Sequence, residues 1–241
     1  MRENVQARAR KLRPAKVRRA VRRRRFEYEL SRLPITDVED LVELGSAYGG
    51  WTVPASMIER LWLCYSVGAG GDISFDRELM QRYGVTVRAF DAVADFVESA
   101  LQEAGDEPRF SAHHAAVATH DGPIRMQQSH DPQSRSVSSA GLYESDRFVE
   151  LPGRTLASLM AELGDDHIDL FKLDIEGAEY DVIPTLDLRA LGVKVFATQL
   201  HHSGSVRQAR ALVTQLRDDG YELVACRPIV KLTFVRRDLI S

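Results

Sequence analysis

Hydrophobic and polar residues follow two alternating periods along most of the chain. Short apolar runs of strand length are separated by segments in which apolar side chains recur every three to four residues, as on one face of a helix. The expected strands are 61–67, 85–90, 109–114, 168–173, 193–200, 221–225 and 229–235, with a short extra strand at 124–127. The expected helices are 37–44, 72–83, 92–104, 155–163, 178–186 and 205–219.

This order of elements predicts the fold class. Five strand–helix alternations that end in a pair of strands are typical of an α/β protein with helices on both faces of its sheet. We therefore expect a doubly wound, Rossmann-like sheet that is mostly parallel, with an antiparallel strand near the C-terminus. The Ser-rich segment 128–146, which contains an Asp-Pro pair, is expected to be a long loop.

Composition agrees with a globular protein. The chain has 241 residues, of which 44% are hydrophobic and 28% are charged, so one large domain is expected. No stretch approaches the roughly 20 apolar residues that cross a bilayer, and no apolar region follows the basic start as in a secretory signal. Cys64 and Cys226 lie in apolar segments and are expected to be free thiols. These features favour a cytoplasmic protein.

Charge is distributed unevenly. Residues 1–25 hold 12 basic side chains and one acid, a net charge of +11, whereas the rest holds 20 basic and 34 acidic side chains, a net charge of −14. We expect a flexible basic arm at 1–25, a helical and loop extension at 26–60 and the main domain at 61–241. The arm either binds a phosphate-rich surface, nucleic acid or anionic lipid, or is a solvated tail with no specific partner.

The first expected strand leads into Gly68-Ala69-Gly70-Gly71-Asp72. A strand that ends in Gly-x-Gly turns sharply and lets a ligand approach backbone N–H groups. Asp91 ends the next strand, where an acid is suited to bind both ribose hydroxyls. A dinucleotide fingerprint would need glycine where Ile73 stands. A nucleoside without phosphate, such as S-adenosylmethionine (SAM), therefore fits better.

The strand at 168–173 ends among charged residues, namely Lys172, Asp174 and Glu176, and Gly177 follows them. In open α/β sheets, ligands bind at this carboxyl edge. Three charged groups at the end of an apolar strand are costly unless they face a site or pair with one another. Lys172 is either part of such a site or a counter-charge for the two carboxylates.

The segment 172–180 resembles the signature of FkbM-type methyltransferases and of related methyltransferase-like proteins. The segments 65–76 and 89–91 are similar to the opening motif of the latter group, and 49–51 and 199–201 fit the same pattern. The resemblance extends from about residue 48 to 235. It implies a class I SAM-dependent methyltransferase, usually one that methylates a hydroxyl of a sugar or natural product.

The resemblance also implies which residues bind the cofactor. Those at the methionine end of SAM would be Gly68, Ala69, Gly70 and Asp72, with Asp91 at the ribose and Val117 beside adenine. Many class I enzymes have an acid where Ser66 stands and a glycine where Asp72 stands. Asp72 is then expected to replace the missing acid as a partner of the amino-acid group.

Methyl transfer to a hydroxyl requires alignment and removal of a proton. The catalytic candidates are His201, Asp174 and Glu176, with His201 as the base because a histidine titrates near neutral pH. Asp174 would orient the acceptor or bind Mg²⁺, which the spacing allows but does not demand. Alternatively, His201 is part of a polar pair at a strand end, and Glu176 is an acid at a helix N-terminus. No metal site is assigned.

Three functions remain open at this stage. The favoured one is O-methylation of a small hydroxylated molecule. The second is methylation of nucleic acid with the basic arm on the phosphates, although an acidic body repels them. The third is a SAM-binding protein without catalysis.

Overall fold

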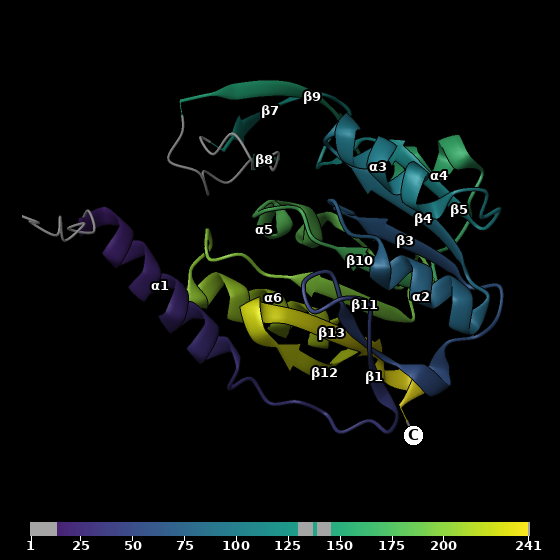
Figure 1. Ribbon diagram of the computed structural model, residues 1–241. Helices are drawn as coiled ribbons and strands as arrows, with labels where there is room; N and C mark the ends of the chain where they lie inside the picture. Colours follow the sequence, from purple (N-terminus) through teal and green to yellow (C-terminus); the bar gives the residue numbers. More distant parts are fainter. Residues whose placement is uncertain (1–13, 130–136, 139–145, 241) are drawn as a thin grey trace, which may run out of the picture.

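The structure, a computed structural model, describes residues 14–129, 137–138 and 146–240 (Figure 1). Its centre is a seven-stranded sheet in the order β12-β13-β11-β10-β3-β4-β5. These strands are β12 (Tyr221–Arg227), β13 (Lys231–Arg236), β11 (Val195–Gln199), β10 (Leu170–Leu173), β3 (Leu63–Val67), β4 (Thr86–Asp91) and β5 (Phe110–His114). Among these seven, β13 alone runs opposite to the others, so it is antiparallel to both β11 and β12. The expected α/β class with a mostly parallel sheet is confirmed.

Helices cover both faces of this sheet. The helices are α1 (Pro14–Leu30), α2 (Ser74–Tyr83), α3 (Ala94–Ala104), α4 (Leu156–Leu163), α5 (Glu179–Val182) and α6 (Val206–Asp218). Short 3-10 turns are η1 (Ala55–Met57), η2 (Ile183–Thr185), η3 (Pro228–Val230) and η4 (Arg237–Leu239). The side chains of α2 and α3 pack on one face, and those of α1, α4 and α6 pack on the other. Thr155 and Ser205 cap α4 and α6 through their hydroxyl groups.

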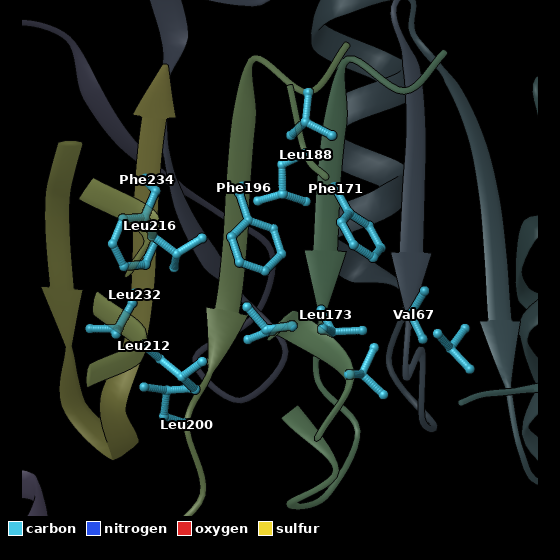
Figure 2. Close-up of a cluster of buried hydrophobic side chains, with 14 of the residues drawn as sticks. Val67, Phe171, Leu173, Leu188, Phe196, Leu200, Leu212, Leu216, Leu232 and Phe234 are labelled. Carbon is cyan, nitrogen blue, oxygen red and sulfur yellow. The ribbon is translucent and has the colours of Figure 1, made fainter. Parts of the chain in front are cut away.

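The largest core cluster lies between the sheet and the helices α1, α4 and α6. Figure 2 shows that Phe171, Phe196 and Phe234 project from three adjacent strands. Their rings are 5.4 Å apart for Phe171–Phe196 and 6.3 Å for Phe196–Phe234, a spacing that favours aromatic packing. This cluster fixes β10 and β11, whose carboxyl ends lead to Asp174 and Glu176 and to His201, respectively.

A hairpin of β1 (Leu41–Leu44) and β2 (Trp51–Pro54) replaces the helix expected at 37–44, which was wrong. Apolar residues in so short a run fit either period. Tertiary packing decides, because the hairpin buries Leu44, Trp51 and Val53 against α2. Gly45 allows this contact: its φ is +91°, and a Cβ there would lie 2.8 Å from the backbone nitrogen of Phe75.

A second, smaller sheet stands beside the end of β5, in the order β6-β9-β7-β8. Its strands are β6 (Ala116–Val117), β9 (Phe148–Arg154), β7 (Gly122–Gln128) and β8 (Val137–Ser138). The expected strand at 124–127 is confirmed within β7. Strand β9 is not among the expected elements, since Pro152 and Gly153 usually interrupt strands. Most of the expected loop 128–146 lies outside the described residues.

Helix α1 crosses the expected boundary at residue 25. Pro14 stands at its first position, where a fixed φ favours helix initiation. Its last turns are anchored in the main core by Phe26 and Leu30, which are 3% and 0% exposed. Residues 1–13 of the expected arm lie outside the described part. No helix in the part of the chain that the structure describes is long and apolar enough to cross a membrane.

Candidate functional site

A cavity of about 340 Å³ opens at the carboxyl ends of β3, β4 and β10, and the small sheet forms its far wall. Most residues singled out from the sequence line it, namely Gly68, Ala69, Gly70, Asp72, Asp91, Val117, Asp174 and Glu176. His201 is not among the lining residues. The sheet edge therefore gathers groups from positions far apart in the sequence into one pocket.

The glycine turn between β3 and α2 is pressed against the end of β10. Gly68 has a φ of +76°, and a Cβ there would lie 1.7 Å from the carbonyl oxygen of Asp174. Only glycine fits such a contact. Gly70 has a φ of +60° with open space around it, so the backbone of the turn faces the cavity without a side chain.

Asp91 ends β4 with its carboxylate fixed by the backbone. Its Oδ2 accepts a hydrogen bond from the amide of Gly70 and its Oδ1 accepts one from Val93, both at 2.8 Å. Burial raises the pKa of Asp91, and these two hydrogen bonds oppose the rise. Since a carboxylate has about four acceptor positions, each oxygen can still accept a hydroxyl from the cavity.

Asp72 connects the glycine turn to the β1–β2 hairpin. Its Oδ2 accepts from the hydroxyl of Ser46 at 2.5 Å, and its Oδ1 accepts from the amide of Ser74 at 2.9 Å. Burial alone would raise the pKa of Asp72, but these hydrogen bonds outweigh it and lower the pKa. Asp72 thus holds the hairpin loop over the cavity while keeping its negative charge.

The wall opposite the glycine turn is apolar. Val117, from β6, is 4% exposed, and Met126 and Val137, from β7 and β8, are 6% and 7% exposed. All three line the cavity. This wall is suited to a flat, weakly polar ring such as a nucleobase.

Two buried charged residues near the glycine turn, Lys172 and Asp76, cannot be assigned a definite role from the sequence. The ammonium group of Lys172 donates to the carbonyl oxygen of Gly68 at 2.8 Å, so Lys172 stabilises the glycine turn. Asp76, on the first turn of α2, is 2% exposed. Burial raises the pKa of Asp76, and the charge of Lys172 opposes that rise. In the sequence, Asp76 is recognisable only as an acid in the first turn of a helix. Acids are common at that position, so it indicates no particular role.

The loops after β10 and β11 bring four titratable groups together. His201 Nδ1 is 2.9 Å from Glu179 Oε1, while its Nε2 is 3.5 Å from Glu176 Oε2 and 3.8 Å from Asp174 Oδ1. Glu179 is fully buried and its Oε1 also accepts from the amide of Ile175 at 3.0 Å. Glu179 was not among the expected site residues. It stands at the start of a helix, where acids are common, so its position indicates no role in a site.

Charge in this cluster favours a protonated imidazole. Burial lowers the pKa of His201, but the charge of Glu179, its hydrogen bond, and the charges of Asp174 and Glu176 outweigh it and raise the pKa to about 9. Asp174, Glu179 and His201 also offer ligand atoms within 4.8 Å of one another, the one such group among the described residues. An imidazolium balances the same carboxylates, so the geometry does not require Mg²⁺.

Helix α1 passes beside this cluster. The guanidinium of Arg22 donates to the backbone oxygens of His202 and Ser203, the latter at 2.8 Å. Neighbouring arginines, at 18, 19 and 23–25, are exposed. A basic surface therefore adjoins the loop that carries His201.

A family model described as "Methyltransferase FkbM domain" matches residues 70–223, more than half of the chain. Among solved structures, ribosomal protein L11 methylase from Lactobacillus delbrueckii subsp. bulgaricus is 14% identical over 76% of this chain and 73% of that chain, with a TM-score of 0.44. The Methanococcus jannaschii fibrillarin pre-rRNA processing protein is 10% identical over 84% of this chain and 85% of that chain, with a TM-score of 0.45.

M. capricolum TrmK, solved with S-adenosyl-homocysteine, is 10% identical over 75% of this chain and 63% of that chain, with a TM-score of 0.40. No curated protein sequence matches the chain. The family match begins inside the glycine turn, at Gly70, and includes the acid that ends β4, the charged end of β10 and most of the residues that line the cavity. The family expected from the sequence is confirmed: the chain belongs to the FkbM methyltransferases and is an enzyme whose cofactor is SAM.

Proposed function

We propose that this methyltransferase methylates a hydroxyl oxygen of a small molecule such as a sugar. One observation carries the proposal: the glycine turn and the acid-bearing end of β10 are in contact on one wall of a single cavity, as the close approach of Gly68 to Asp174 requires. A carboxylate at that point is placed to bind a hydroxyl beside the cofactor's reactive end.

The residues proposed to bind SAM are those expected from the sequence. Gly68, Ala69, Gly70 and Asp72 would surround the methionine end, Asp91 would accept the ribose hydroxyls, and Val117 would flank adenine. The cavity supports this placement, because its backbone is bare at the turn, acidic at Asp91 and apolar at Val117. SAM supplies an electrophilic methyl group on a sulfonium.

The chain itself must hold the acceptor hydroxyl in line and take its proton. We assign the contact with the hydroxyl to Asp174 or Glu176, because both line the cavity and His201 does not. The carboxylate would take the hydroxyl proton as the acceptor oxygen accepts the methyl group that SAM would supply. His201 would balance the charge of the two carboxylates, which lie 3.5 and 3.8 Å from its Nε2, while Glu179 at Nδ1 and Gln199 at Nε2 orient its ring.

The test is calorimetry with SAM and S-adenosyl-homocysteine, followed by a screen of hydroxylated acceptors with mass detection of one added methylene. Asp91→Ala should abolish SAM binding. Asp174→Asn should leave SAM affinity within about threefold and remove turnover, since the role assigned to Asp174 lies in the transfer step. Binding of a nicotinamide dinucleotide in place of SAM, or turnover that survives loss of both Asp174 and Glu176, would refute the proposal.

A nucleic-acid acceptor is the second candidate, favoured by the arginines of α1 beside the His201 loop. The acidic body, with a net charge of −14 outside residues 1–25, opposes it. If it is correct, serine substitutions at Arg18, Arg19 and Arg23 should abolish a salt-sensitive gel shift with RNA or DNA. A small molecule methylated equally well by this triple variant would favour the first candidate.

A further inference from the structure

Tyr48 is a large aromatic residue at the rim of the cavity and is 80% exposed. It lies in the loop between β1 and β2. A single exposed tyrosine is ordinary on a protein surface. The surroundings of Tyr48 are not ordinary, because its backbone is hydrogen-bonded on both sides and it lines the cavity together with Asp174 and Glu176.

Hydrogen bonds fix the loop that carries Tyr48. Its amide donates to the hydroxyl of Ser46 at 3.1 Å, and that hydroxyl in turn donates to Asp72. From the other side, the ammonium group of Lys231 donates to the carbonyl oxygens of Tyr48 at 2.8 Å and Gly50 at 2.9 Å. These hydrogen bonds hold the backbone of the loop in one place, which lowers the part of the entropic cost of binding that comes from ordering the loop.

The phenol of Tyr48 lies within electrostatic reach of the acids in the site. Partial desolvation raises the pKa of Tyr48, and the charges of Glu176, Asp174 and Asp72 raise it further. Tyr48 lines the same cavity as the glycine turn and the carboxylates at the end of β10. This is the place where an acceptor must lie if its hydroxyl is to meet Asp174.

A second exposed apolar side chain reaches the same cavity from another element. Ile229, in η3, is 48% exposed and has φ 57° and ψ 20°. A β-branched residue in this left-handed region is strained, and such strain persists where the surroundings enforce it. Ile229 precedes Lys231 by two residues, and Lys231 bonds to the Tyr48 backbone, so both apolar groups belong to one rim.

We propose that Tyr48 and Ile229 form the acceptor platform of this enzyme, with the apolar face of a hydroxylated ring, a saccharide or cyclic polyol, on Tyr48 and its hydroxyls toward Asp174 and Glu176. This inference rests on the proposed function and adds the residues that select the acceptor. An aromatic ring beside carboxylates matches such a molecule, whose ring carbons are weakly polar and whose edge carries hydroxyls. Tyr48 is a binding residue and takes no part in proton transfer.

The test uses the full chain saturated with S-adenosyl-homocysteine and labelled with ¹³C in its tyrosine rings. The probes are methyl glucopyranoside, methyl rhamnopyranoside and myo-inositol, titrated while NMR follows the rings. We expect the Tyr48 resonances to shift with at least one probe. Tyr48→Ala should then weaken that probe's affinity by at least about fivefold, and Tyr48→Phe should retain it.

Tyr28→Ala is the matched control, because Tyr28 is an exposed tyrosine (57%) on α1, away from the cavity lining, and it should leave probe affinity unchanged. Ile229→Ser should also weaken binding, while calorimetry should show unchanged SAM affinity in all variants. Unmoved Tyr48 resonances with every probe, or equal affinities for wild type and Tyr48→Ala, would overturn the platform. SAM binding together with a methylated product in the same preparation would leave the proposed function standing, so the two failures are distinguishable.

Discussion

The pair formed by His201 and Glu179 gives the protein a stability that depends on pH. His201 is 10% exposed and Glu179 is fully buried, with 2.9 Å between Nδ1 and Oε1. Burial lowers the pKa of His201, but the charge and hydrogen bond of Glu179 raise it more, and Asp174 and Glu176 add to the rise, to about 9. The folded state therefore binds this proton more tightly than the unfolded state does.

The size and sign of this pH dependence follow from the difference between the pKa of His201 in the folded chain and in the unfolded chain. A pKa of about 9 in the folded chain against about 6.5 in the unfolded chain corresponds to about 3 kcal/mol of stability. Because the folded pKa is the higher one, this contribution is fully present below about pH 6.5. It decreases as the pH rises and is lost once the pH passes about 9.

Urea denaturation between pH 6 and pH 10 measures this effect. The free energy of unfolding of the wild type should fall across the window more steeply than that of His201→Gln, by up to about 3 kcal/mol in total. His202→Gln is the control: burial and neighbouring arginines lower the pKa of His202 to about 4, so it carries no proton in the folded chain and should influence the curve only below about pH 7, where the unfolded chain binds a proton at this residue. Parallel curves for wild type and His201→Gln would refute the reasoning.

Other predictions concern the glycine turn, a partly buried ion pair and the core. Gly68→Ala should abolish SAM binding in calorimetry because its Cβ would lie 1.7 Å from a carbonyl oxygen at the end of β10, whereas Gly105→Ala, at φ +60° with open space around it, should retain binding. Asp165→Asn should cost about 1.5 to 3 kcal/mol in urea denaturation, because Asp165 accepts from Arg88 at 2.6 and 2.9 Å. Burial alone would raise the pKa of Asp165, but its hydrogen bonds hold the pKa below its usual value. This contribution to the free energy of unfolding should therefore be present near neutral pH and decline as the pH falls below about 4. If wild type and Asp165→Asn lost stability equally below about pH 4, the prediction would be contradicted. Phe196→Ala should lower the free energy of unfolding by about 3 to 5 kcal/mol, and a loss below about 1 kcal/mol would show that Phe196 is not tightly packed.

The sequence by itself determined the seven-stranded sheet, the helices α2 to α6 and the groups at its carboxyl edge that line the cavity. Buried parallel strands need continuous apolar runs, and their helices need a 3.6-residue period, so both can be recognised without knowing the neighbours. Glycines at 68 and 70 and the acid at 91 are identified because a strand, a glycine turn, a helix and an acid in this register are typical of a nucleoside-binding edge. The family assignment came from the same segments.

Only the tertiary structure decided which short segments became strands and which acids met. The run 41–44 pairs with 51–54 because Trp51 and Leu44 are buried together against α2, a contact that no local pattern encodes. Glu179 and His201 are 22 residues apart, and only the adjacency of β10 and β11 brings them within hydrogen-bonding distance. The pKa of His201 depends on that contact, so the sequence could name the histidine but not its charge.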